Sequence, residues 1–130
     1  MELETILARG IAGWLQFEHS CHRASIFSEK YLSTPIAQIL NTKFGKYVHA
    51  EIKHPILGSK SLGRGRPPEI DFVVYDEKHE IKVAIESNWV CSNITKQIVE
   101  KILWDLIRLT MIGNSDQIKC YFILAGEKKT

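Results

Sequence analysis

The sequence predicts an α/β fold, because stretches with helical periodicity alternate with stretches that have strand periodicity. Apolar residues recur at helical spacing near the N-terminus, before Gly45 and before Gly113. Strand patterns fill 46–52, 70–75, 81–89 and 119–124. A long helix before the last strand allows a parallel crossover, so we expect a mixed central sheet flanked by helices.

The sequence predicts the first helix from regular apolar spacing, whereas a proline interrupts the second helical stretch. One is expected from Leu3 to Leu15, where apolar residues follow helical spacing. A second helical stretch runs from Ile26 to Leu40 and contains Pro35. Because proline fits the first helical position and disrupts later ones, either this helix kinks at Pro35 or a turn at 28–31 leads into a new helix.

The third helix has the clearest signals. Ser92 or Asn93 can cap its start, and Gly113 and Asn114 can end it. Its predicted core stripe consists of Ile94, Ile98, Ile102, Leu106 and Leu109.

The second and third strands are predicted to form a hairpin through the polar turn at 76–80. Alternation puts Asp71 on the face opposite Ile70, Phe72 and Val74. In the third strand it puts Ile81, Val83 and Ile85 on one face and Lys82, Ala84, Glu86 and Asn88 on the other. If the hairpin pairs as its turn implies, Asp71 and Glu86 come together near the strand ends.

Composition restricts the class of protein. The 130 residues are 45% apolar and 25% charged, as in a globular domain, and no apolar run approaches the roughly 20 residues of a membrane span. An acidic N-terminus and three scattered cysteines predict a cytoplasmic protein with free thiols. The net charge of +2 permits nucleic-acid binding without indicating it.

Asp71 and Glu86 point to a metal site. Two adjacent carboxylates repel each other unless a cation lies between them. Mg²⁺ or Mn²⁺ takes one or two carboxylates, keeps several waters and activates a bound water. For either acid alone, a solvent-facing position on an amphipathic strand is the simpler interpretation, but the apolar residues on both sides of Glu86 argue against it.

Pro68-Glu69-Ile70-Asp71, followed by Ile85-Glu86-Ser87-Asn88, resembles the split motif of the PD-(D/E)XK nucleases. The helical stretch that begins near Ser28 resembles the helix that precedes this motif. The resemblance implies a restriction-endonuclease-like αβββαβ core, a Mg²⁺- or Mn²⁺-dependent endonuclease acting on DNA, and a further acidic site residue at Glu29. It covers 28–124 of a single domain, 1–130, and leaves 1–27 as an N-terminal helical extension.

Asn88 departs from the family pattern, which calls for lysine at this position. Some restriction enzymes of the family carry Glu or Gln there, and a lysine can be replaced deliberately to trap a complex. The lysine can also have migrated, with Lys96 and Lys101 as candidates, although a solvated helix face is the simpler explanation for both. Finally, the domain can be a catalytically degenerate module that binds nucleic acid or protein.

The loop at 58–68 is the predicted nucleic-acid contact, through Lys60, Arg64 and Arg66. Its glycines permit close approach to a phosphate, and its cations neutralise one. By analogy with the family, a homodimer with an interface on the N-terminal helix is also expected. The short run of His19, Cys21 and His22 lacks the spacing of a zinc site.

Overall fold

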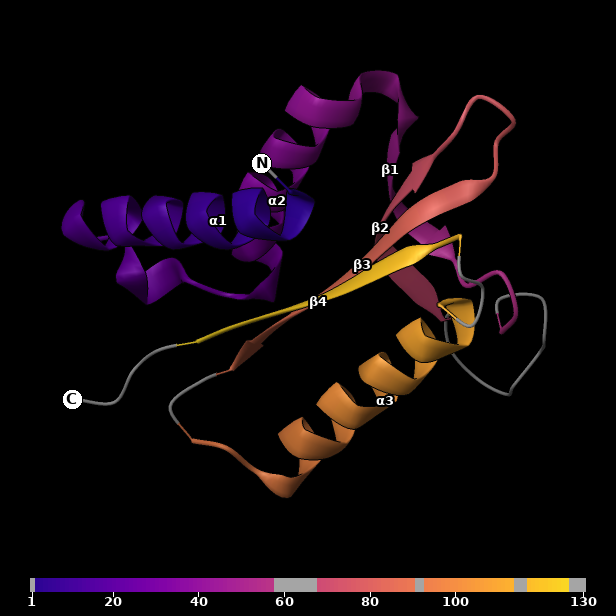
Figure 1. Cartoon of the computed structure of the whole chain (residues 1–130). Helices are drawn as coiled ribbons and strands as arrows, with labels where there is room; N and C mark the ends of the chain where they lie inside the picture. Colours follow the sequence, from indigo (N-terminus) through magenta and orange to yellow (C-terminus); the bar gives the residue numbers. More distant parts are fainter. Residues whose placement is uncertain (1, 58–67, 91–92, 114–116, 127–130) are drawn as a thin grey trace. The chain divides into compact units, whose positions relative to one another are not determined.

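The computed structural model describes residues 2–57, 68–90, 93–113 and 117–126. The chain divides into two compact units, Met1–Lys46 and Tyr47–Thr130 (Figure 1). Together they give an α/β structure with a four-stranded mixed sheet. No helix in the described ranges is both long and apolar enough to cross a membrane.

The first unit is helical. It contains α1 (Leu3–Ser20), a 3₁₀ turn (Ala24–Ile26) and α2 (Glu29–Phe44). The Ser28 side chain caps α2 by accepting a hydrogen bond from the backbone N–H of Tyr31, at 3.1 Å. The helix then continues through Pro35. Of the two alternatives for this stretch, the structure therefore has a new helix beginning after Ser28.

The second unit is built on a sheet with strand order β1-β2-β3-β4. The β1/β2 and β2/β3 pairs are antiparallel, whereas β3 and β4 are parallel and joined by α3. The mixed sheet, the hairpin and the parallel crossover predicted from sequence are thus confirmed. The elements are β1 (Val48–Lys53), β2 (Glu69–Tyr75), β3 (Ile81–Val90), α3 (Lys96–Ile112) and β4 (Lys119–Gly126).

Helix α3 lies along one face of the sheet (Figure 1). Leu109 and Ile112 pack there with Val73 and Ala84, and these side chains are nearly fully buried. The helix begins later than predicted, because Thr95 rather than Ser92 or Asn93 is its N-cap. The predicted core stripe is partly wrong, since Ile94 and Leu106 are 69% and 37% exposed.

The β2–β3 turn fixes how the two strands pair. The Oδ1 atom of Asp76 accepts hydrogen bonds from the backbone N–H groups of Lys78 and Glu80, at 2.9 Å each. These bonds and the ammonium of Lys82 lower the pKa of Asp76, so the turn holds a carboxylate rather than a carboxylic acid.

One extra residue in β3 follows this turn. Tyr75 pairs with Ile81 but Val74 pairs with Val83, which leaves Lys82 as a β-bulge. Ile81 therefore packs with the core that α3 covers, and the prediction that it shares a face with Val83 is wrong. Strict alternation failed because the bulge shifts the register by one residue.

His54 ties the end of β1 to α3. The side chain is 2% exposed, and its Nδ1 accepts hydrogen bonds from the backbone N–H groups of Ile56 and Leu57, at 3.1 and 3.0 Å. Its Nε2 lies 2.8 Å from the carbonyl oxygen of Arg108. An Nδ1 that accepts leaves the ring proton on Nε2, so the imidazole is neutral and donates to Arg108.

We expect His54→Ala to lower the free energy of unfolding by about 2–4 kcal/mol, because it leaves three backbone groups without their partner. Urea denaturation followed by circular dichroism measures the loss. His19→Ala, an exposed histidine of α1, is the matched control and changes stability by less than about 0.5 kcal/mol. Equal effects of the two substitutions would contradict the assigned role.

Candidate active site

Asp71 and Glu86 lie at the end of the β2–β3 ladder. The β2–β3 pairing ends with Phe72 opposite Ile85, and continuing the register by one residue sets Asp71 opposite Glu86. The Asp71 Oδ2 atom accepts hydrogen bonds from the backbone N–H of Ser87, at 2.8 Å, and from its hydroxyl, at 3.1 Å. The carboxylate thus takes the place of a backbone acceptor where regular pairing ends, and this fixes its position.

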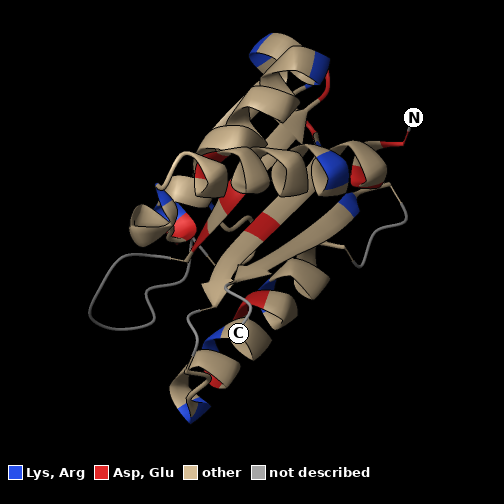
Figure 2. Cartoon of the chain, turned by 90° about the vertical axis from the view of Figure 1, so that its left-hand side faces the viewer, with Lys and Arg blue, Asp and Glu red and all other residues tan. Residues whose placement is uncertain are grey.

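A second group of polar side chains joins β3 to α3. Asn88 donates from Nδ2 to Asp105 Oδ2 and accepts at Oδ1 from Lys101 Nζ, both at 2.6 Å. Arg108 forms an ion pair with the other oxygen of Asp105. Basic and acidic residues alternate along the sequence of α3, as Figure 2 shows. Asn88 and Asp105 are 3% and 4% exposed, so the centre of this network is buried, whereas Lys101 is exposed.

Glu86 has a strongly raised pKa of about 9. Burial is the first cause, since the residue is only 5% exposed, and the negative charges of Asp71 and Asp105 follow. The guanidinium of Arg108 opposes them only in part, and a hydrogen bond to Asp71 further favours the protonated form. At neutral pH the Glu86 carboxyl is therefore neutral and donates its proton towards the Asp71 carboxylate.

The donor set fits a hard divalent cation. Mg²⁺ and Mn²⁺ bind one or two carboxylates and complete their coordination with water. Asp71 and Glu86 could provide these two carboxylates, because a cation would replace the proton that they share. Within the described residues, no group of three or more His, Cys, Asp or Glu side chains could hold a metal ion.

The remaining predicted site residues lie elsewhere. Lys96 is exposed at the first turn of α3 and is not among the partners of Asn88 or Asp105. Glu29 begins α2 in the first unit, and its part in the site stays a prediction. The predicted nucleic-acid contacts lie outside the described residues; they are Lys60, Arg64 and Arg66.

Sequence reasoning missed Asp105 and Arg108. The sheet-facing residues of α3 recur at 98, 102, 105, 109 and 112, so an acid occupies the middle of an otherwise apolar series. A carboxylate at a core position is costly unless it is paired, and Arg108 three residues later supplies the partner. The signal was present in the sequence, but assigning Leu106 to the stripe concealed it.

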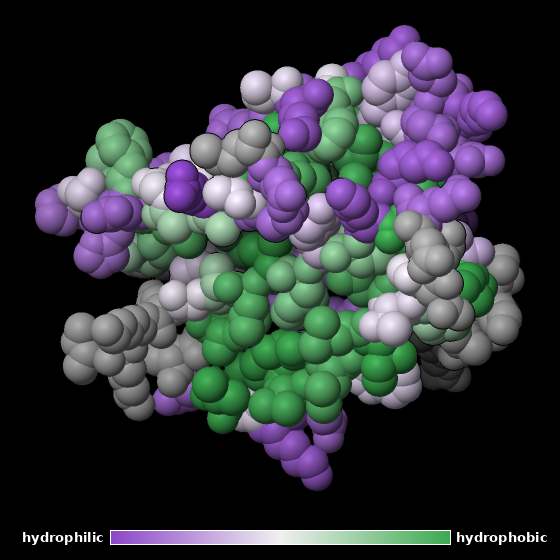
Figure 3. All heavy atoms as spheres, viewed as in Figure 1, coloured by the Kyte–Doolittle hydropathy of each residue, from purple (hydrophilic) through white to green (hydrophobic). Residues whose placement is uncertain are grey.

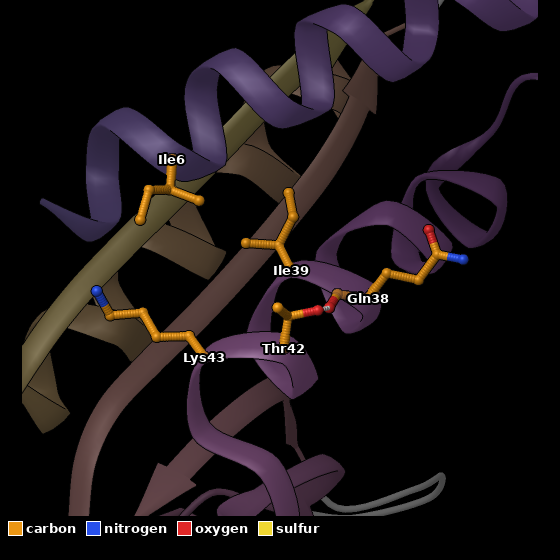
Figure 4. Close-up of a pocket in the computed structure, with 5 residues that line it drawn as sticks. All are labelled: Ile6, Gln38, Ile39, Thr42 and Lys43. Atoms are coloured by element: carbon orange, nitrogen blue, oxygen red, sulfur yellow. Dashed lines mark hydrogen bonds between the residues drawn. The ribbon is translucent and has the colours of Figure 1, made fainter. Parts of the chain in front are cut away.

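A hollow on the first unit is a poorer candidate. It lies between α1 and α2, and Ile6 and Ile39 form its apolar part (Figure 4). Gln38, Thr42 and Lys43 complete the lining. Lys43 is the sole titratable side chain among these five, so the hollow offers no acid–base pair.

We expect Glu86→Gln to stabilise the protein in EDTA, increasingly so from pH 5 to pH 8. The pKa of Glu86 is higher in the folded protein than in the unfolded chain, where it is 4.5. The parent protein therefore keeps its full free energy of unfolding below pH 4.5 and loses up to about 1 kcal/mol per pH unit as the pH rises towards 9. Glutamine keeps the donor to Asp71 and has no proton to lose. Thermal unfolding across this pH range measures the difference.

Glu100→Gln, an exposed glutamate of the same helix as Asp105, is the matched control and is expected to follow the parent protein at every pH. A pH-independent effect of Glu86→Gln would mean that the Glu86 carboxyl is ionised in the folded state.

The function of this chain has to be inferred from the geometry of the site. No family model, curated protein or solved structure matches this chain.

Proposed function

We propose that this protein is a Mg²⁺- or Mn²⁺-dependent endonuclease that hydrolyses phosphodiester bonds of DNA. The observation that carries the proposal is the buried carboxyl pair of Asp71 and Glu86 at the end of the β2–β3 ladder. A protein that needed only stability would gain by replacing such a pair with apolar side chains. Keeping it is costly, and residues kept at such a cost are typical of functional sites.

The proposed roles follow from the contacts. Asp71 and Glu86 would hold the cation, with Asp71 positioned by Ser87. When bound, the cation lowers the pKa of a coordinated water and offsets negative charge on the phosphate. Lys101 would supply the positive charge that the family pattern places on the strand, because its Nζ contacts the side chain of Asn88. Asn88 would orient that ammonium, since its amide is fixed on the other side by Asp105.

The order of elements supports a restriction-endonuclease-like αβββαβ core. From α2 onwards the chain runs through β1, β2, β3, α3 and β4, and the two acids lie on the second and third strands, as in the split motif. Of the explanations for Asn88, the Lys101 contact favours a migrated lysine.

The alternative is a degenerate nuclease-like module that binds nucleic acid or protein without cleaving. Asn88 itself favours it, because an amide carries no charge and cannot act as a base at neutral pH. The two proposals differ in whether Lys101 matters for turnover, so the same variants test both.

We expect Mn²⁺ to bind to the parent protein, with loss of the Glu86 proton, and not to Asp71→Asn or Glu86→Gln, because each substitution removes one of the two carboxyl ligands. Isothermal titration calorimetry measures the affinity, without any assumption about the substrate. Glu100→Gln should bind as the parent does. Equal binding by all four proteins would place any cation elsewhere.

We expect Lys101→Ala to lower Mn²⁺-dependent cleavage of duplex or single-stranded DNA by roughly 100-fold, because one positive charge at the reacting phosphate is lost. Lys96→Ala, on the exposed first turn of the same helix, should stay within about twofold. Plasmid nicking and cleavage of labelled oligonucleotides measure both rates.

Two results would favour the degenerate module. One is the absence of cleavage by the parent protein together with DNA binding that survives Glu86→Gln. The other is cleavage that appears only in Asn88→Lys, since restoring the strand lysine would then create an activity that Lys101 does not provide.

A further inference from the structure

The outer face of α3 carries large apolar side chains that no described residue of the second unit covers. Four large side chains on this face are 37% to 52% exposed: Val99, Leu103, Leu106 and Ile107. In the space-filling view of Figure 3, hydrophobic residues cover the region where Figure 1 places α3. Scattered apolar residues are normal on a surface, but a continuous patch marks an interaction site.

The spacing of these residues is that of a packing seam. Positions 99, 103, 106 and 110 recur at intervals of four, three and four, with Thr110 as the last member. Leu109 and Ile112 belong to a separate stripe that packs against the sheet. A helix with two apolar stripes can bury both only against two partners, and the sheet supplies one.

Strand β4 adds an edge to the same surface. Among the described strands it pairs with β3 alone. Leu124 is 55% exposed and lies opposite Asn88 in the register, on the face of the sheet that α3 covers. From Cys120 to Gly126 the strand has no charge and no proline, so it lacks the features that usually protect an edge strand from pairing.

The exposed area matches half of a dimer interface. With Leu124 and the neighbouring Trp104, which is 61% exposed, the patch presents on the order of 500 Å² of apolar side-chain surface. A standard interface buries about 800 Å² per partner, of which roughly 60% is apolar. A two-fold interface brings the same patch of both copies together. An uncharged apolar seam and an unpaired strand edge can each pack against their own copies without placing like charges opposite each other.

We propose that the outer face of α3 and the adjoining edge of β4 form the interface between two copies of this chain related by a two-fold axis. This interface belongs to the second unit; the interface on the N-terminal helix that the family analogy suggests stays a separate prediction. It does not depend on the proposed nuclease activity.

The test is the mass in solution of the parent protein, Leu103→Glu and Phe17→Glu, measured by light scattering after size exclusion. The parent should have a mass near twice 14.9 kDa. Leu103→Glu should be monomeric, because a charge at the centre of the seam would be buried against its own copy. Phe17→Glu, an equally severe change at a 62% exposed residue of α1, should remain dimeric. Circular dichroism checks that each variant is folded.

Mixing Leu103→Glu with Leu103→Lys distinguishes a two-fold seam from other arrangements. The mixture should recover the dimer mass, because opposite charges then meet across the axis. Ile107→Glu repeats the disruption one turn away in case Leu103→Glu does not fold. A monomeric parent, a dimer that survives both Glu substitutions, or a mixture that stays monomeric would overturn the proposal.

Discussion

The candidate site depends on the pairing register of β2 and β3. The Asp76 turn starts the hairpin, and the bulge at Lys82 then moves all later pairs by one residue. Without the bulge, Asp71 would lie opposite Ile85, and the side chain of Glu86 would point to the other face of the sheet. With it, the two carboxyl groups share the face on which α3 places Asp105 and Arg108. A single extra residue therefore decides whether the acids meet.

The polar groups beneath α3 replace part of a hydrophobic core. Leu109 and Ile112 fill one end of the interface between helix and sheet, whereas Asp105 and Arg108 occupy the neighbouring turn. Almost every buried polar atom there has a partner; the Nε of Arg108 is the exception among the described side chains. The low dielectric that makes such a network costly also strengthens its hydrogen bonds, so its members hold each other in one arrangement.

The sequence was sufficient for the order of elements, because periodicity and the glycine stops depend on local chemistry. The hairpin turn also predicted that Asp71 and Glu86 come together near the strand ends, although the register that sets them opposite each other depends on the bulge. The bulge at Lys82 was not predictable, since its signal is a pairing irregularity rather than a residue type. Asp105 was missed for another reason: a helix with apolar residues on two sides has no unique stripe, and Leu106 fitted the periodicity equally well. The sequence offered Lys96 and Lys101 equally as migrated lysines, and only the packing of α3 on the sheet shows that Lys101 contacts Asn88.

Helix α3 carries the site residues on one side and the apolar seam on the other. A helix moves as a rigid rod, so any rotation about its own axis shifts Lys101 and Asp105 together with Leu103. If both proposals hold, association of two copies and cation binding become thermodynamically linked, and each strengthens or weakens the other by the same factor. The hydrogen bond from the His54 imidazole to the carbonyl oxygen of Arg108 would resist that rotation and limit the size of the linkage.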